Sequence, residues 1–290
     1  MPPLERPFTL SDLRAARQSG EKLAMLTCYD YTNARLMQRA GVPMLLVGDS
    51  AANVILGHST TLPIGLDFMI QLTAAVRRGA PLAMVIADMP FGSYHASTAQ
   101  GVKNVCKMVK LSGCDCVKLE TGPAHLPLVR RLADAGVAVM VHLGLRPQTI
   151  GMLGGYRYQA RTANGADELI MSAREAEDHG AAALLLEAVP PEASAAVVKE
   201  TSLPVIGCGA GPACHGHVVV TQDALGLTDR PPRFVPHLAN LADPAITAFT
   251  EYARQVREQE YPARQHQYEM PAEEREEFFR RHGPRPSERA

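Results

Sequence analysis

The stretch MLLVGDSAAN (residues 44–53) contains the pattern that decides the fold. Met44 to Val47 carry no polar side-chain atom, as in a strand that is buried on both faces. Asp49 and Ser50 follow almost at once. A single ending of this kind is compatible with a turn or a helix cap. If other strands end in the same way, the polar residues indicate a shared site.

The same order of amphipathic helix, glycine, apolar strand and polar ending recurs along the chain. We expect helices over residues 32–40, 67–78, 97–112, 123–135, 167–179 and 192–199. Five of them end at a glycine expected to adopt the left-handed conformation, namely Gly41, Gly79, Gly113, Gly136 and Gly180. We expect apolar strands over 22–30, 44–47, 82–88, 116–120, 137–144, 181–188, 203–211 and 218–227.

Eight apolar strands alternating with helices predict the α/β class and a closed (β/α)8 TIM barrel. An open doubly wound sheet is the alternative, but it would need a glycine-rich turn after an early strand, and the sequence has none there. A helix over 11–19 is expected to cap the bottom of the barrel, and one over about 245–260 to form a C-terminal helical extension. We expect one domain over 1–262 and a charged, flexible tail over 263–290.

The composition is that of an ordinary globular protein. Hydrophobic residues make up 46%, charged residues 20%, and the net charge is -1, which argues against nucleic acid or a membrane as partner. The N-terminal sequence lacks the order of a secretory signal, so we expect a cytoplasmic protein. The six cysteines are scattered and are expected to be reduced. Cys214-His215-Gly216-His217 is spaced too tightly for a zinc site.

Polar residues end most of the predicted strands. In a parallel barrel all these ends lie at one mouth, where such enzymes place their active sites. Taken singly, an aspartate could cap a helix, a lysine could extend its ammonium group to solvent, and a histidine could belong to the core. Together they favour a site. Its members are Asp49, Ser50, Asp88, Lys118, Glu120, His142 and Glu187, with a glycine cluster at Gly207, Gly209 and Gly211.

Several carboxylates without a thiolate make a hard oxygen site that suits Mg²⁺. Such a metal could bind a 2-oxo acid through its carboxylate and ketone oxygens and stabilise an enolate. Glu187 follows three leucines, so desolvation should raise its pKa toward that of a working base. Lys118 and His142 would meet the substrate carboxylate and the developing oxyanion. The set predicts proton abstraction next to a carbonyl, followed by carbon–carbon bond formation.

Several motifs together resemble the ketopantoate hydroxymethyltransferase family, in the superfamily of barrels similar to phosphoenolpyruvate mutase and isocitrate lyase. The resemblance covers roughly residues 8 to 262. It is carried, in order, by TCYDYTNARL, VGDS, GHSTTLPI, AAVRRGAP, ADMPF, VKLE, VHLGLRPQ, GGYRYQAR, LLLEAVP, PVIGCGAG and QDALGL. It implies transfer of a one-carbon unit from 5,10-methylenetetrahydrofolate to 3-methyl-2-oxobutanoate. The product would be 2-dehydropantoate (ketopantoate), in the first step toward pantothenate and coenzyme A.

The resemblance also implies roles for single residues. Asp49 and Asp88 would bind Mg²⁺ and substrate, and Glu120 would be an outer partner of the metal. Ser50, Lys118 and His142 would contact the substrate, and Glu187 would be the catalytic base. A homodecamer is implied as well. The sequence departs from the family pattern at Ala51-Ala52-Asn53, at Ser59 and over 211–216.

Three alternatives remain open at this point. One is a Mg²⁺-dependent 2-oxo acid carbon–carbon lyase or aldolase of the same superfamily. Those lyases carry a cysteine on a mobile loop, whereas residues 151–165 contain none and form a candidate lid. A second is a metal-free aldolase that uses Lys118 as a Schiff-base nucleophile. A third is an inactive copy that serves as an assembly module.

Overall fold

The strands form a closed barrel in the computed structural model, which describes residues 3–283. They are parallel and follow one another in chain order, with the last pairing to the first. This confirms the predicted (β/α)8 TIM barrel. The strands are β1 (Leu23–Thr27), β2 (Met44–Val47), β3 (Met84–Asp88), β4 (Cys116–Glu120), β5 (Val139–Gly144), β6 (Ala183–Glu187), β7 (Val205–Cys208) and β8 (Gly216–Val219).

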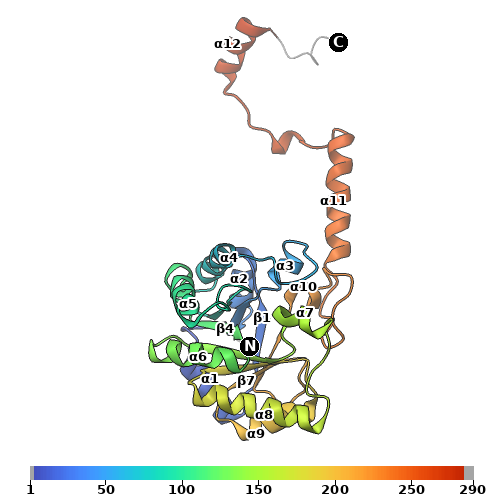
Figure 1. The fold of residues 1–290 in the computed structure, drawn as a ribbon. Coiled ribbons are helices and arrows are strands. Elements are labelled where there is room, and N and C mark those ends of the chain that lie inside the picture. The colour runs from blue at the N-terminus through green and yellow to red at the C-terminus, as the bar shows by residue number, and fades with distance from the viewer. Residues whose placement is uncertain (1–2, 284–290) are drawn as a thin grey trace. The chain divides into compact units, whose positions relative to one another are not determined.

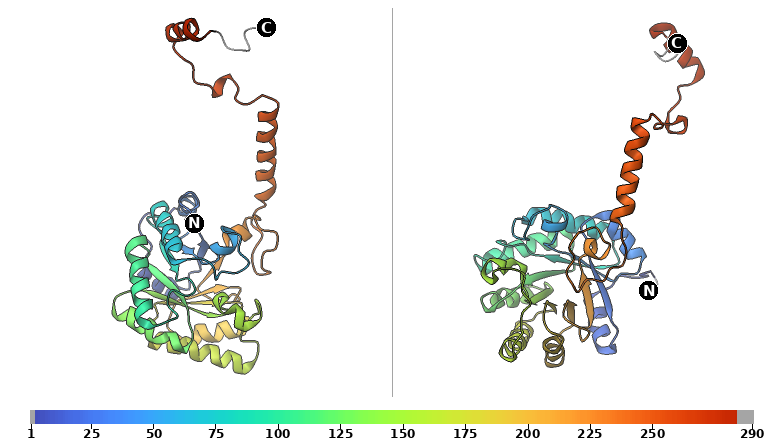
Figure 2. Two further views of the ribbon diagram at one scale, coloured as in Figure 1. Left: turned by 45° about the horizontal axis from the view of Figure 1, so that its top comes forward. Right: turned by 90° about the vertical axis from the view of Figure 1, so that its right-hand side faces the viewer.

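Helices surround the strands (Figures 1 and 2). The longer ones, which alternate with the strands, are α2 (Tyr31–Arg39), α4 (Leu66–Gly79), α5 (Thr98–Ser112), α6 (Leu126–Asp134), α8 (Ala163–Asp178) and α9 (Pro191–Glu200). Short helices lie between strands and helices at α3 (Ala51–Val54), α7 (Ile150–Leu153) and α10 (Thr221–Ala224). All six helices predicted between strands are present. Their observed bounds differ from the predicted ones by a few residues, as is usual for fraying ends.

Two hydrophobic cores result from this arrangement. One fills the layer between the strands and the surrounding helices. The other fills the barrel interior, with Met25, Met44 and Met84 among its members. Leu13 and Ala16 of α1 (Leu10–Ser19) belong to this inner core and are buried. The predicted role of the N-terminal helix as a cap on the barrel is therefore confirmed.

Side chains alternate between the two cores along each strand, because successive residues of a strand point to opposite faces. In β4, Cys116 belongs to the inner core, and Val117 and Leu119 belong to the outer one. Lys118 and Glu120 thus continue the inward-facing line of the strand. The same alternation places the strand-terminal residues Asp88, His142 and Glu187 on the inward-facing lines of β3, β5 and β6.

Four of the five predicted glycine caps are left-handed. Gly41, Gly113, Gly136 and Gly180 have φ values between 72° and 83°. Gly79 is different, because it is the last residue of α4 and does not have a positive φ. A Cβ there would lie 2.5 Å from the carbonyl oxygen of Tyr31 and 2.8 Å from the Cβ of Ala34. Gly79 therefore allows α4 to pack closely against α2, and the prediction of a left-handed cap was wrong.

The described chain divides into two compact units between residues 239 and 240, and these units are residues 3–239 and 240–283. The second contains α11 (Ala242–Arg257) and α12 (Ala272–His282). The sequence predicted the first of these helices but not the second. Our grouping of residues 1–262 as one domain stays a prediction, as does the flexible tail over 263–290, of which 284–290 lie outside the described residues. Across 3–283, no helix has the length and apolar character that a bilayer span requires.

Candidate active site

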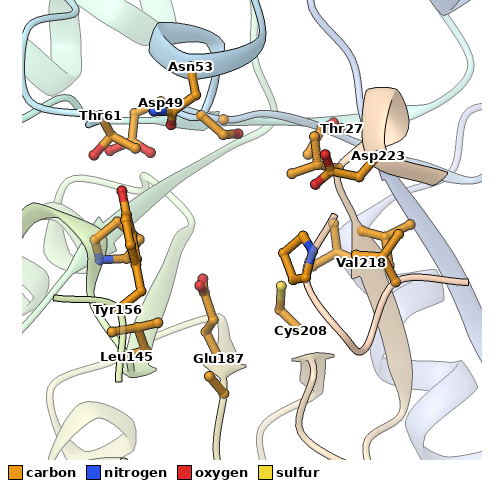
Figure 3. A pocket seen from close by; sticks show the side chains of 18 of the residues that line it. Thr27, Asp49, Asn53, Thr61, Leu145, Tyr156, Glu187, Cys208, Val218 and Asp223 are labelled. Atoms are coloured by element: carbon orange, nitrogen blue, oxygen red, sulfur yellow. The ribbon is translucent and has the colours of Figure 1, made fainter. Parts of the chain in front are cut away.

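A cavity of about 720 Å³ opens at the carboxyl ends of the strands. Its lining includes all seven site residues that the sequence predicted: Asp49, Ser50, Asp88, Lys118, Glu120, His142 and Glu187. Figure 3 shows Glu187 pointing into the cavity, with Asp49 and Tyr156 on one side of it. The barrel therefore brings together residues that lie far apart in the sequence.

Strand register sets which of these side chains are neighbours. Asp88 of β3 pairs with Lys118 of β4, and Glu120 of β4 pairs with His142 of β5. Lys118 Nζ lies 3.0 Å from Asp88 Oδ1 and 3.1 Å from His142 Nδ1, and all three side chains are buried. The result is a buried row of acid, ammonium and imidazole across three adjacent strands.

Lys118 is held in its charged form. Burial alone would lower the pKa of its ammonium group, but the Asp88, Asp49 and Glu120 carboxylates more than offset this and raise the pKa above its usual value. A protonated amine is not a nucleophile. The local electrostatics thus argue against the Schiff-base alternative for Lys118.

His142 is held in its neutral form. Burial, and after it the Lys118 cation, lower the pKa of the imidazole well below its ordinary value. Because the Lys118 ammonium has only donors, Nδ1 must accept from it, which places the ring proton on Nε2. Nε2 has no hydrogen-bond partner among the described residues, and Glu187 Oε2 lies 3.4 Å away. His142 can therefore donate Nε2–H to an oxygen in the cavity.

Glu187 lies at the end of β6, with its carboxylate near Nε2 of His142 while that of Glu120 is near Nδ1 of the same ring, and its side chain is 20% exposed. Burial raises the pKa of this carboxyl to about 7, although the more distant Lys118 cation partly opposes the shift. A carboxylate with such a pKa is a stronger base than an ordinary glutamate and is still ionised in part at neutral pH. This agrees with the direction of shift that the sequence predicted.

A residue that the sequence analysis missed connects two of the acids. Gln148 Nε2 donates to Asp49 Oδ2 at 2.8 Å, and the Gln148 backbone N–H donates to Glu120 Oε2 at 2.9 Å. Tyr94, also missed, donates its hydroxyl to Gln148 Oε1 at 2.9 Å. Both side chains are buried. Gln148 ends the quoted motif VHLGLRPQ, which was the available signal, but it follows the strand in a short 3-10 helix rather than ending it.

Ser50 and the neighbouring departures from the family pattern have clear places. The Ser50 hydroxyl hydrogen-bonds with that of Tyr29 at 2.8 Å. Ala51 and Ala52 are fully buried in α3, whereas Asn53 and Ser59 line the cavity.

The predicted glycine cluster does not line the cavity. Gly207, Gly209 and Gly211 line a second cavity instead. A Cβ at Gly209 would lie 2.5 Å from the Phe234 ring, so this glycine makes room for that aromatic side chain.

The acidic residues fit a divalent cation. Asp49, Asp88 and Glu120 are buried, and within residues 3–283 the only lysine or arginine that forms an ion pair with any of them is Lys118, which pairs with Asp88. Among the residues that the structure describes, Glu120 Oε1 has no hydrogen-bond partner, and Asp88 Oδ1 has only the ion pair with Lys118. Within residues 3–283 no three His, Cys, Asp or Glu side chains converge as a finished metal cage. Two carboxylates that leave positions open for water and substrate match the usual coordination of Mg²⁺.

The closed barrel and the acid, lysine and histidine groups at its mouth define a (β/α)8 barrel enzyme. Solved structures share the fold. 2,3-Dimethylmalate lyase, described as a phosphoenolpyruvate mutase/isocitrate lyase superfamily member, has a TM-score of 0.57 at 17% identity and covers 93% of both chains. Phosphonopyruvate hydrolase in complex with oxalate and Mg²⁺ has a TM-score of 0.58 at 15% identity, covering 94% of this chain and 98% of that one.

Sequence comparison identifies the family within this class. The family model for ketopantoate hydroxymethyltransferase matches residues 7–264. The chain is 44% identical over 263 residues to 3-methyl-2-oxobutanoate hydroxymethyltransferase of Thermobifida fusca, covering 91% of this chain and 94% of that protein. It is 45% identical over 265 residues to the protein of that name from Prosthecochloris aestuarii, covering 90% and 96%. The chain belongs to the ketopantoate hydroxymethyltransferase family, which confirms the resemblance and makes it a transferase of this kind.

Proposed function

We propose that the chain transfers the one-carbon unit of 5,10-methylenetetrahydrofolate to C3 of 3-methyl-2-oxobutanoate, with Mg²⁺ as its metal. One water is consumed, and the products are 2-dehydropantoate and tetrahydrofolate. The observation that carries the proposal is that the carboxylates of the cavity have different partners. Asp88 pairs with Lys118, and Gln148 hydrogen-bonds both Asp49 and Glu120. Glu187 lies beside His142, and its pKa is raised to about 7.

Asp49 and Asp88 would hold the metal, and Glu120 would support it as an outer partner. When bound, Mg²⁺ would polarise the ketone of the substrate and favour its enolate. Gln148 fixes Asp49 and Glu120 relative to each other through its two hydrogen bonds. Hydrogen bonds to the side chains that hold a metal orient those side chains.

Lys118, His142 and Ser50 would bind the 2-oxo acid. The Lys118 ammonium and the Nε2–H of His142 are donors that face the cavity, so they can meet the substrate carboxylate and the oxygen on which charge develops. His142 stays neutral and therefore acts as a hydrogen-bond donor rather than as a base.

Glu187 would remove the C3 proton of the substrate. The methylene carbon is bonded to two nitrogens of the folate, so both carbon–nitrogen bonds must break. Water adds its hydroxyl group to this carbon as one carbon–nitrogen bond breaks, and the carbanion carbon forms the new carbon–carbon bond as the other breaks. The remaining proton of the water and the proton taken from C3 end on the two nitrogens of tetrahydrofolate. Removal of the C3 proton by Glu187 comes before any step that involves the folate. This proton removal can therefore be observed without folate.

The test is an assay of ketopantoate formation with purified protein, 3-methyl-2-oxobutanoate and the folate, with and without Mg²⁺. We expect product only when 3-methyl-2-oxobutanoate, the folate and Mg²⁺ are all present. EDTA should abolish the activity, and added Mg²⁺ should restore it. Substrate should also raise the melting temperature more in the presence of Mg²⁺ than without it. Cleavage of a 2-oxo acid without folate would instead support the lyase alternative.

A further inference from the structure

The cavity has a second polar wall, made of residues other than those that we assign to the 2-oxo acid. Asp223, Thr27 and Thr228 line it, and Figure 3 shows Asp223 and Thr27 across the cavity from Asp49 and Tyr156, with Glu187 between the two sides. A volume of about 720 Å³ lies within the range of cavities that hold drug-sized ligands. A substrate of eight non-hydrogen atoms would leave much of it open.

Asp223 is held firmly in this wall. It lies in α10, which follows β8, and is 9% exposed. The Thr221 hydroxyl and backbone N–H bond to Thr27 of β1 at 2.6 and 3.0 Å. On the other side, the Leu238 N–H donates to the carbonyl of Ala224 at 2.9 Å. The aspartate is therefore fixed between the barrel and the segment that follows α10.

The Asp223 carboxylate has capacity left for a ligand. Its Oδ1 accepts a hydrogen bond from the Thr228 hydroxyl, and no hydrogen bond within residues 3–283 reaches Oδ2. A carboxylate can accept about four hydrogen bonds through its two oxygens. No lysine or arginine forms an ion pair with it in the described chain. A buried acid in this state, facing a cavity, is suited to a ligand with two adjacent N–H donors.

We propose that Asp223 binds the pterin ring of the folate co-substrate through the ring's N3–H and 2-amino group. These two donors lie side by side and match the two oxygens of a carboxylate. The proposal rests on the proposed function, since it assigns a binding site to that reaction's second substrate. It places the pterin on the wall opposite the 2-oxo acid.

The surroundings of Asp223 suit the rest of the folate. Phe234, Tyr156 and Tyr158 supply aromatic surface at the cavity for stacking against a flat ring. Arg230 and Arg233 also line the cavity and are exposed. They could therefore pair with the carboxylates of the folate's glutamate tail where that tail extends into solvent. The transferred methylene bridges two nitrogens at the end of the pterin away from its 2-amino group. With that group on Asp223, the methylene can face the side of Glu187.

The experiment compares wild type with Asp223→Asn, which keeps the size of the side chain but replaces one acceptor by a donor. We expect the KM for 5,10-methylenetetrahydrofolate to rise about 10- to 100-fold, the worth of hydrogen bonds to a charged group. The KM for 3-methyl-2-oxobutanoate should change little. Folate-free exchange of the C3 proton in heavy water should continue, because it does not use this wall.

Two controls separate ligand binding from a structural role of Asp223. Thr228→Val removes the hydrogen bond within the turn, and we expect it to change the folate KM by no more than about fivefold. A tetrahydrofolate whose 2-amino group is replaced by methyl should bind wild type more weakly than tetrahydrofolate does, while Asp223→Asn should distinguish the two ligands far less.

The outcomes decide between the two proposals. An unchanged folate KM in Asp223→Asn, or an equal preference of wild type and variant for the 2-amino ligand, would overturn the assignment of Asp223. So would a Thr228→Val variant that reproduces the full effect, because the carboxylate would then act only on the turn. Wild type that exchanges the C3 proton but forms no ketopantoate with folate would refute the proposed function instead.

Discussion

Glu187 differs from Asp88 because it lies beside the neutral imidazole of His142, whereas Asp88 forms an ion pair with Lys118. This predicts that Glu187→Gln retains Mg²⁺ and substrate binding but slows C3 proton exchange by about 10²–10⁴, the usual worth of a general base. Proton NMR of 3-methyl-2-oxobutanoate in heavy water measures the rate. Exchange at the wild-type rate, with binding intact, would assign the base to another residue.

The same carboxyl predicts the pH dependence of the reaction. Since burial raises the pKa of Glu187 to about 7, the group is mostly protonated below this pH and cannot act as a base there. We therefore expect kcat/KM for exchange to rise with pH through about 7 and to level off above it. A pH–rate profile in wild type checks this. An acid limb centred near the pKa of an ordinary glutamate would contradict it.

Gln148 is a positioning residue for the acids that would hold the metal. Replacing it with Leu removes the side-chain bond to Asp49 but keeps the backbone bond to Glu120. We expect Mg²⁺ affinity to fall about 10- to 100-fold, as when other residues that hydrogen-bond to metal ligands are replaced. Calorimetric Mg²⁺ titration measures the change. Gln148→Asn is the conservative control, and unchanged affinity in Gln148→Leu would assign the residue a packing role only.

Substitution of Asp49 or Asp88 should reduce Mg²⁺ binding more than substitution of Gln148 does. Asp88→Asn removes the negative partner of Lys118 at 3.0 Å as well as a metal ligand. Both Asp88→Asn and Asp49→Ala are expected to keep the barrel fold but to lose most Mg²⁺ binding and most activity. Circular dichroism and calorimetry together test this. Normal Mg²⁺ binding in both variants would exclude them from the metal site.

The sequence could predict the site residues that end strands, and it could not predict those that lie in loops. Lys118, His142 and Glu187 stand out because an ammonium, an imidazole or a carboxylate interrupts or ends a continuous apolar run. Gln148 and Tyr94 follow β5 and β3 in irregular segments, where no periodicity tells which side chain turns inward. Asp223 was overlooked because it sits in a helix of four residues rather than at a strand end.

At the scale of elements, the glycine at the end of α4 sets how closely two helices approach. The sequence marked Gly79 as a helix end but could not show that a neighbouring helix passes over it. Gly79→Ala would place a methyl group against the Tyr31 carbonyl and the Ala34 side chain of α2. Figure 1 labels both α2 and α4. We expect a loss of about 1–3 kcal/mol in the free energy of unfolding, as in other overpacked sites.

Gly101 in α5 is the matched control for this substitution. The three atoms nearest to a Cβ there all belong to the Leu128 side chain, with Cδ2 at 2.6 Å, and the end of a leucine can move where a backbone carbonyl cannot. The better helix propensity of alanine offsets part of the cost. Denaturant unfolding should therefore rank Gly79→Ala as clearly less stable than Gly101→Ala. The reverse order would contradict the packing explanation.

At the scale of the whole molecule, α11 carries apolar residues that the rest of its own compact unit does not cover. Ile246 and Phe249 are 60% and 71% exposed, and Tyr252 and Val256 continue the spacing of three to four residues. Such a stripe is typical of a surface that contacts a partner. The homo-oligomer, expected as a decamer, stays a prediction, and this stripe is a candidate contact surface for it.

Phe249→Asp tests this surface. We expect the variant to form smaller assemblies than wild type, because a carboxylate at the contact would be buried without a partner. Light scattering coupled to size-exclusion chromatography measures the mass. Thr247→Asp, on the opposite side of the helix, should leave the assembly unchanged. Equal masses for wild type and Phe249→Asp would exclude the stripe from the contact.

The pairing of β1 with β8 has a consequence for how a new chain matures. Leu23 in β1 lies opposite Gly216 in β8, so nearly the whole barrel must be synthesised before the first strand has both neighbours. At roughly 5–20 residues per second, the ribosome needs about 10–40 s to make that length. Throughout this interval one edge of β1 has no strand to pair with. The polypeptide therefore passes through a period of vulnerability to aggregation that ends only when its last strand arrives.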